Sequence, residues 1–592
     1  MSYKLLSLLL AAGLTLTACS DSYMEDLNTD ETKTTEMDPN QQLTTGLLQT
    51  YGDFQLMDTY RSYITGFTQY YAGGWNVSQY AGAVYPSNNE MAHLWDRYYG
   101  IGIKNMADAI SHSEDKLNVH AALRIHNAYL LSVLADTYGD VPCSDAGRGY
   151  LSGKNNPEYD TQEDIYNWLF TELETCGQLM GSGSDALTGD VTSMKGDPAA
   201  WKRYANSLRM RYAMRISDVN PTKAKTEFEK AMKAEGGYIT SSVQDAYIIY
   251  LNSPFTLYDG AADYDFRANA LGEILYGQDP TSPTLVSSTL YNHLENTSDP
   301  RLWRICRNYI HTSRSQTSTD GNFDVTDEVL AWKERGGTGT VPCNIGDAWW
   351  SDWVNGPSKS ECPTLERLDA EFPNVGYNGN NFPARIIRPS LATNFQNADC
   401  PGILITYAEV QFLLAEAKLL GWDVEGTVED HYNAGVRAAM EMMNKYYILP
   451  YADKVEAGMP EWYKRPTIAP ISEDEIADYL TLNPLGDNPK EAINTQAWIL
   501  HLTNPSEGWA NLRRSDYPAL MDRTKLPVRG DFPHEDPIMT TPVRLMYPKL
   551  EQDYNLDNYN AALQRMGGSD NWHKRVWWDT KEQNFYDPTT NK

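Results

Sequence analysis

The chain has 592 residues, 41% of them hydrophobic, and its formal net charge is −30 at pH 7. This charge argues against nucleic-acid binding and against a basic patch that holds the body to anionic lipid. The length allows a large core and several domains. Tyr (39) and Trp (16) far outnumber Phe (13). Most of these rings are expected to pack between helices, but their polar edges also suit wet ligands such as sugars and peptides.

The N-terminus has the pattern of a lipoprotein signal. Lys4 supplies a positive charge, residues 5–16 form an apolar run too short to span a bilayer comfortably, and small residues lead into Cys19. We therefore predict that residues 1–18 are removed and that Cys19 is acylated as the lipid anchor. The alternative is an ordinary signal peptide in which Cys19 is incidental. Residues 19–40 form a polar segment rich in acidic side chains, and they are expected to be a flexible tether.

From residue 41 onward, helical patterns dominate the sequence. Asp197-Pro198 and Asn220-Pro221 are typical helix starts, and Gly236-Gly237 is a typical helix end. Small residues at helix contacts favour a helical-repeat scaffold, although no strict 34-residue period is present. The predicted helices span about residues 121–134, 161–179, 197–216, 220–236, 406–420, 428–445, 474–480 and 493–503.

The middle of the chain differs from both ends. Residues 240–399 hold many Gly, Pro, Asn, Ser and Thr residues and few long periodic runs. We expect irregular loops with some short helices there, inserted between helical halves at about residues 41–239 and 400–592. The predicted fold class of the body, residues 41–592, is therefore all-α with a large irregular, loop-rich insertion.

Six cysteines follow Cys19, and they allow fifteen disulfide connectivities. Cys343 and Cys362 flank a Trp-rich loop and form the favoured pair. No C-x-x-C motif is present, so a zinc ribbon is not expected. The six are Cys143, Cys176, Cys306, Cys343, Cys362 and Cys400.

Two aromatic clusters are candidate ligand-binding segments. In the first, Gly73 and Gly74 interrupt a helical pattern and would lift Trp75 onto a loop, where a sugar could stack on its indole. Asn76 would bond sugar hydroxyls, and Tyr80 completes this candidate set. The alternative is that these rings pack on the next helix.

The second cluster is a polar, Gly-punctuated loop with three tryptophans that are hard to bury together. Trp349, Trp350 and Trp353 are predicted to form an exposed aromatic platform, to which Trp75 is a candidate addition. The alternative is a local aromatic core beneath the long loop. If the platform binds ligand, truncating Trp350 or Trp353 should each cost about 1–3 kcal/mol of affinity.

Other notable residues have structural interpretations. Trp572, Trp577, Trp578 and Asp579 are expected to pack inside the body. Glu409 and Glu416 are expected to lie on a solvated or salt-bridged helix face. A basic stripe on the helix at 197–216 is expected to form internal ion pairs; its members are Arg209, Arg211 and Arg215.

The sequence shows no catalytic signature. H-E-x-x-H, G-x-S-x-G and a phosphate-binding loop are all absent, and the ten His residues lack ligand spacing. We predict no catalytic residues, no cofactor and no metal ligands. A pair of glycosidase carboxylates stays open, because such pairing is three-dimensional.

An ordered series of phrases resembles the SusD/RagB family of outer-membrane nutrient-binding lipoproteins. Each phrase is weak alone, but together with the lipoprotein signal they cover the chain from Cys19 to its C-terminal region. Cys143 departs from the family pattern, in which a tyrosine is common there. The phrases are DTYGDVP (136–142), WKRYANSLRMR (201–211), TYAEVQFLLAEA (406–417), HYNAGVR (431–437), QAWI (496–499), EGW (507–509), RR (513–514), YP (547–548) and WWD (577–579).

The resemblance implies a tetratricopeptide-like scaffold on the outer membrane at the cell surface, held by lipid alone. It implies a non-enzymatic protein that captures a glycan and passes it to a TonB-dependent SusC-like barrel. The alternatives are peptide capture of the RagB type, a surface glycoside hydrolase, and an assembly scaffold that binds only protein.

Overall fold

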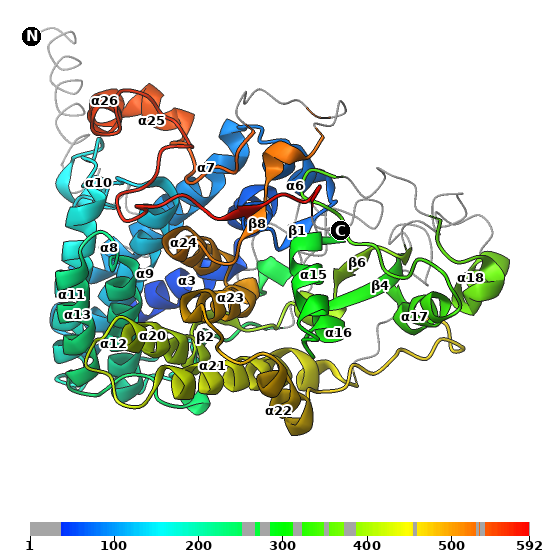
Figure 1. Cartoon of the computed structure of the whole chain (residues 1–592). Helices are drawn as coiled ribbons and strands as arrows, with labels where there is room; N and C mark the ends of the chain where they lie inside the picture. Colours follow the sequence, from blue (N-terminus) through cyan, green and yellow to red (C-terminus); the bar gives the residue numbers. More distant parts are fainter. Residues whose placement is uncertain are drawn as a thin grey trace, which may run out of the picture.

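The computed structural model describes residues 37–251, 267–272, 285–311, 322–347, 355–371, 386–453, 459–527, 532 and 539–590. Cys19 and its neighbours lie outside these ranges. Helices form most of the body, as predicted, and Figure 1 shows them grouped on the left, with the middle of the chain on the right. The longer helices of the N-terminal half are α3 (Pro39–Gly52), α4 (Phe54–Thr59), α7 (Asn88–Arg97), α8 (Lys104–Ser111), α9 (Leu117–Tyr138), α11 (Gln162–Leu179), α12 (Pro198–Arg215) and α13 (Pro221–Lys233).

The predicted helix boundaries are close to the observed ones because capping residues fix them. Asp197 accepts a hydrogen bond from the Ala199 amide at the start of α12, and Asn220 accepts one from Lys223 at the start of α13. The C-terminal half continues with α20 (Tyr407–Leu419), α21 (Val428–Met443), α22 (Glu473–Leu482), α23 (Pro489–Leu500), α24 (Pro505–Ser515), α25 (Lys549–Tyr554) and α26 (Leu556–Arg565).

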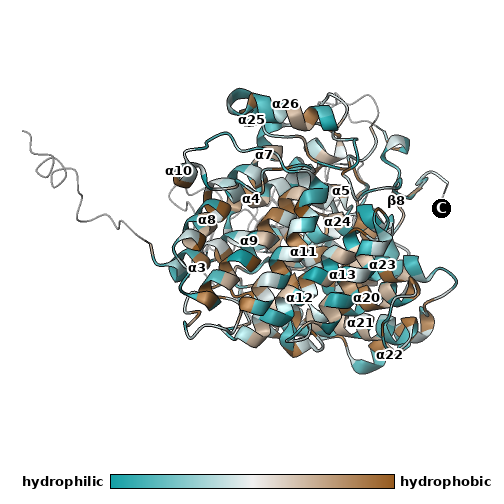
Figure 2. Ribbon diagram, turned by 90° about the vertical axis from the view of Figure 1, so that its left-hand side faces the viewer, coloured by the Kyte–Doolittle hydropathy of each residue, from teal (hydrophilic) through white to brown (hydrophobic). Residues whose placement is uncertain are grey.

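The long helices pack as successive neighbours. Helix α9 packs on α11, α11 on α12, and α12 on α13. Helix α12 also contacts α20, which packs on α21 and α23, so one continuous helical layer joins both halves of the chain. Figure 2 shows α11, α12, α13 and α20 side by side. The arrangement confirms the predicted helical-repeat scaffold.

Buried ion pairs hold the two halves together. The Arg211 guanidinium on α12 donates to both Glu409 oxygens on α20, at 2.6 and 2.8 Å. Arg215 bonds Glu507 on α24 at 2.6 Å. Within the C-terminal half, Glu416 on α20 accepts from Arg514 on α24. The predicted internal pairing is confirmed, and these pairs are buried rather than solvated.

Four strands from the middle of the chain and one from its N-terminal half form a sheet that the sequence analysis did not predict. Its strand order is β1-β3-β6-β4-β5, and each neighbouring pair is antiparallel. These strands have two to six residues, too short to show a clear alternation of apolar and polar side chains. They are β1 (Tyr71–Ala72), β3 (Leu285–Val286), β4 (Cys306–His311), β5 (Asn322–Asp324) and β6 (Pro389–Leu391).

Short helices flank this sheet, as expected for the insertion. Helices α17 and α18 form a small separate core with β4 and β5, in which Ile310, Phe323 and Leu368 are buried. Two further strand pairs join distant segments: β2 (Ala246–Ile248) with β7 (Gly402–Ile405), and β8 (Leu520–Met521) with β9 (Phe585–Tyr586). The helices of the insertion are α15 (Ser288–Asn296), α16 (Leu302–Ile305), α17 (Thr326–Glu334) and α18 (Pro363–Glu371).

The favoured disulfide between Cys343 and Cys362 is wrong. Cys343 packs with Ala72 and Leu285 beside the sheet, whereas Cys362 belongs to the small core of α17 and α18. Both cysteines pack among apolar side chains of their own cluster, as free cysteines often do. Within the described residues, none of the six cysteines forms a disulfide bond with another.

The C-terminal aromatic residues pack inside the body, as predicted. Trp572 and Trp578 are buried. The Trp578 indole nitrogen donates to Asp136 Oδ1 at 2.8 Å, which ties the chain end to α9.

Candidate ligand-binding site

Trp75 is an exposed aromatic side chain at the end of the sheet. Gly73 leaves β1 with a φ of +79°, and a Cβ there would lie 2.9 Å from Leu285 Cδ1. Gly74 is extended and caps α6 (Trp75–Val77), so Trp75 begins a short helix rather than lying on a loop as predicted. Trp75 is 46% exposed, so its indole reaches the surface.

The indole of Trp75 is held in place by Phe532. Their ring centroids lie 5.3 Å apart at an interplanar angle of 80°, an edge-to-face contact. Phe532 is itself buried beside Ala83 and Tyr85. A neighbouring ring therefore orients Trp75 while leaving nearly half of it open to solvent.

Asn76 and Tyr80 accompany Trp75 on the same short helical segment. Tyr80 belongs to the π-helical turn η2 (Ser78–Gly82), a local widening that often occurs at functional sites. Its ring stacks on Tyr85 at 6.4 Å, and burial together with Glu90 raises the pKa of its hydroxyl, so the hydroxyl stays protonated. Asn76 is half-buried, and no hydrogen bond within the described chain engages its amide.

A turn at residues 344–347 locks onto this segment. The Ser78 hydroxyl donates to the Asp347 carbonyl at 2.6 Å. A Cβ on Gly82 would lie 2.8 Å from Gly346 Cα, so the two backbones touch. The buried Arg523 guanidinium donates to the Gly82 carbonyl. Gly346 has a φ of +92°, and a Cβ there would lie 2.9 Å from that guanidinium.

The second predicted cluster lies outside the described residues. Trp349, Trp350 and Trp353 follow Asp347, the last described residue before that segment. Asp347 therefore lies beside Ser78, and Ser78 is three positions after Trp75 in the sequence.

Sequence reasoning missed Phe532, Ser78, Gly346 and Arg523. Phe532 is a single aromatic residue in a Pro-rich stretch, and nothing local marks it as a partner of Trp75. Of the other three, Gly346 brings its backbone against that of Gly82, and Ser78 and Arg523 donate hydrogen bonds to backbone carbonyl groups. Such contacts between residues hundreds of positions apart leave no pattern in the chain.

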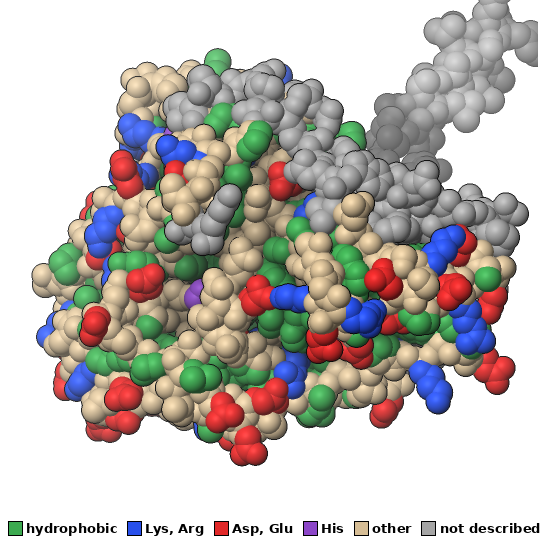
Figure 3. All heavy atoms as spheres, turned by 45° about the vertical axis from the view of Figure 1, so that its right-hand side comes forward, with side chains coloured by type: hydrophobic (Ala, Val, Ile, Leu, Met, Phe, Trp, Pro, Cys, Tyr) green, Lys and Arg blue, Asp and Glu red, His purple; other side chains and the backbone are tan. Residues whose placement is uncertain are grey.

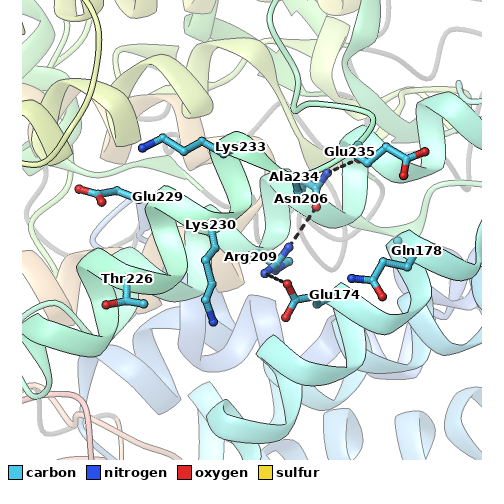
Figure 4. A pocket seen from close by; sticks show the side chains of 11 residues that line it. Glu174, Gln178, Asn206, Arg209, Thr226, Glu229, Lys230, Lys233, Ala234 and Glu235 are labelled. Carbon is cyan, nitrogen blue, oxygen red and sulfur yellow. Dashed lines mark hydrogen bonds and ion pairs between the residues drawn. The ribbon is translucent and has the colours of Figure 1, made fainter.

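A hollow between α11, α12 and α13 differs chemically from the surface around Trp75. It has a volume of about 710 Å³, and the side chains of Arg209, Asn206 and Glu174 point toward one another there (Figure 4). Arg209 lies 3.2 Å from Glu174, and Lys233 pairs with Asp423 at 2.8 Å. No aromatic side chain lines it, so it offers no stacking surface for a sugar.

One buried cluster has the residue types of a cation site. The ligand atoms of Glu409, His501 and Glu507 lie within 4.8 Å of one another. However, Arg211 and Arg215 bond both carboxylates and supply the balancing positive charge. The two guanidinium groups lower the pKa of Glu507, and burial lowers the pKa of His501. The cluster is therefore a neutralised ion-pair network.

Comparisons with known proteins agree with this fold. Residues 31–334 match the family described as "Starch-binding associating with outer membrane", and residues 377–579 match "Susd and RagB outer membrane lipoprotein". The chain belongs to the SusD/RagB family. No curated protein sequence matches this chain.

Solved structures extend the comparison. A structure titled "Bacteroidetes AC2a SusD-like" has 37% identity and a TM-score of 0.80, and covers 92% of this chain and 100% of its own. One titled "chitin-binding protein" has 27% identity and a TM-score of 0.69, with the same coverage. A chitin-binding SusD homolog from Flavobacterium johnsoniae, at 21% identity and a TM-score of 0.61, covers 92% of this chain and 98% of its own and shares the fold.

Within the described ranges, no helix has the length and apolar content to cross a bilayer. Acidic side chains are spread over the face shown in Figure 3, with basic ones between them. That face shows no continuous basic patch.

Proposed function

We propose that this surface nutrient-binding protein captures a neutral oligosaccharide on the platform of Trp75, Asn76 and Tyr80. The observation that carries the proposal is the indole of Trp75, exposed yet held edge-on by Phe532. A fixed aromatic face can stack on the apolar side of a sugar ring without losing conformational freedom on binding. The adjacent Asn76 amide offers donors and an acceptor for hydroxyls.

The charge of the protein supports a neutral ligand. A chain with a net charge of −30 repels anionic glycans at long range. The similarity to the chain titled "chitin-binding protein" supports a glycan and makes N-acetylglucosamine oligomers the first to test. A peptide ligand of the RagB type is the second candidate, since the C-terminal family description names both SusD and RagB.

Binding should depend on Trp75. We expect Trp75→Ala to weaken binding of the oligosaccharide by about 1–3 kcal/mol, as for other aromatic anchors, with little change in melting temperature. Calorimetric titration with chitohexaose, cellohexaose, maltohexaose and a mixed-sequence hexapeptide measures this. Tyr554→Ala is the matched control, because that aromatic side chain is 75% exposed on α25. Equal affinity of parent and Trp75→Ala contradicts the platform, and binding of the peptide alone favours the RagB-type function.

The Trp-rich segment is proposed to extend this platform, because Asp347, the last described residue before it, is bonded to Ser78. Trp350→Ala and Trp353→Ala should each weaken the same titration by about 1–3 kcal/mol. A large fall in melting temperature with unchanged affinity would instead show an internal aromatic core.

We also propose that the captured glycan is delivered to a SusC-like TonB-dependent barrel in the outer membrane. Family membership supports this role. Two results would support it: a barrel copurifies with the acylated protein, and uptake of the bound glycan by the cell requires both proteins. Glycan uptake that is unaffected by loss of the protein contradicts it.

A further inference from the structure

Helix α15 turns one uncharged polar face toward a hollow of about 650 Å³. Asn292 and His293 lie three and four residues after Thr289, and four and three residues before Asn296, so all four lie on one side of the helix. None of the four is Lys, Arg, Asp or Glu, although 22% of the chain is charged. The four are Thr289, Asn292, His293 and Asn296.

The opposite wall comes from the C-terminal region. Strand β8 pairs in parallel with β9, which places Tyr586 beside Met521. Pro588 and Thr590 continue that wall beyond β9. Trp498 also lines the hollow; it is fully buried, and its indole nitrogen donates to the Thr68 carbonyl at 3.0 Å.

The buried side chain of Gln69 joins the two walls. Its Oε1 accepts from Thr289 Oγ1 at 2.5 Å and from the Met521 amide at 2.9 Å. Its Nε2 donates to the Met521 carbonyl at 2.8 Å. Because one amide bridges α15 and β8, the walls are held at a fixed separation.

The amides that face the hollow have unused hydrogen-bonding capacity. Asn292 and Asn296 are exposed, and no hydrogen bond within the described ranges engages their side chains. The Ser288 hydroxyl donates to Asn344 Oδ1 at 2.7 Å, which leaves the Asn344 amide nitrogen as a donor. A primary amide presents two donors and an acceptor, which is the pattern that neighbouring sugar hydroxyls complement.

We propose that this hollow is a second binding site for a neutral sugar residue, distinct from the Trp75 platform. Its volume falls in the range of small-molecule sites, and amides from α15 and from the 344–347 turn line it together with Tyr586. The 344–347 turn contributes to both sites, since Asn344 lines the hollow and Asp347 bonds Ser78. The inference rests on the proposed function, because it assumes that the ligand is a glycan.

Equilibrium dialysis with radiolabelled chitotriose, cellotriose and maltotriose tests the proposal, because short ligands can fill each site separately. The variants are Trp75→Ala, the pair Asn292→Ala and Asn296→Ala, and all three together. We expect two equivalents of at least one trisaccharide on the parent, one on each single-site variant and none on the combined variant. Glu295→Gln, on α15 but outside the hollow, should keep two equivalents.

The outcomes separate the two proposals. One equivalent that is lost in Trp75→Ala and unchanged by the asparagine pair overturns the second site and leaves the proposed function standing. Binding of none of the three sugars by the parent contradicts both. Asn292 and Asn296 are exposed, so the melting temperature of the paired variant should match that of the parent. If the paired variant unfolds and loses an equivalent, Asn292→Asp decides the outcome, because it should fold and still lose that equivalent.

Discussion

At the scale of single residues, buried charge is handled in two ways. Arg514 and Glu416 are both buried and bond each other at 2.6 and 2.8 Å, so each charge is compensated. Asp579 is also buried, but its Oδ1 has no hydrogen-bond partner. Burial outweighs the nearby Arg513 and raises the pKa of Asp579 to about 7. The fold therefore favours its protonated form.

This preference makes the stability of the fold depend on pH. The pKa of an aspartate is about 3.9 in an unfolded chain. Because the pKa is raised in the folded state, the contribution of Asp579 is fully present below pH 4 and is lost as the pH rises through about 7. We expect Asp579→Asn to stabilise the protein by about 2–4 kcal/mol at pH 8 and to have little effect at pH 4.

Thermal unfolding of parent and variant at pH 4 and pH 8 measures the difference. Asp115→Asn, an exposed loop residue, is the control and should follow the parent at both values. A variant that is less stable than the parent at pH 8 would show that Asp579 is needed as a carboxylate.

Residues also differ in how far the sequence revealed them. Trp75 was predictable because two adjacent glycines break the local pattern and force the next side chain outward. Its partner Phe532 was not, because their contact joins residues 457 positions apart and depends on the whole fold. The arginine pairing on α12 was predictable in kind, yet its acidic partners on α20 and α24 were not.

At the scale of elements, capped helices were predictable and short strands were not. Asp197-Pro198 and Asn220-Pro221 each begin the helix expected of them. The strands of the central sheet gain their stability from neighbours that the chain reaches only after long excursions, so a local pattern cannot reveal them. Cys343 and Cys362 were paired in the prediction because they flank a Trp-rich loop, but they belong to two different apolar clusters.

The 344–347 turn and η2 should behave as one element. In Gly346→Ala, the new Cβ would meet the Arg523 guanidinium, and the left-handed backbone would be strained. We expect binding of the preferred hexaose to fall by roughly 1–2 kcal/mol, because the support beneath Trp75 shifts, while the helical layer keeps its structure. Titration together with far-ultraviolet circular dichroism measures both effects.

Gly421→Ala is the control for that experiment, since its φ is +75° and open space surrounds it. It should cost a similar backbone strain and leave binding unchanged. If both variants bind like the parent, the turn does not support the platform.

At the scale of the whole molecule, attachment and ligand capture are separate properties. We expect Cys19→Ala to leave the protein soluble or stalled as a precursor, because the acyl chains would provide its strong attachment to the membrane. The purified body should still bind the same hexaose. Fractionation of cells followed by immunoblotting measures the first effect, and titration measures the second. A variant that stays as tightly in the outer-membrane fraction as the parent shows that another contact holds it there.

The ion pairs between α12 and the later helices α20 and α24 have a consequence for how the chain matures. Arg215 meets Glu507 only after nearly three hundred further residues have been made, and Trp578 reaches Asp136 only at the end of synthesis. Because such distant closures delay folding, the first helices must wait with their charged side chains unmatched. We therefore expect the newly made chain to depend on chaperones during export, and the finished protein, once closed, to resist unfolding in pieces.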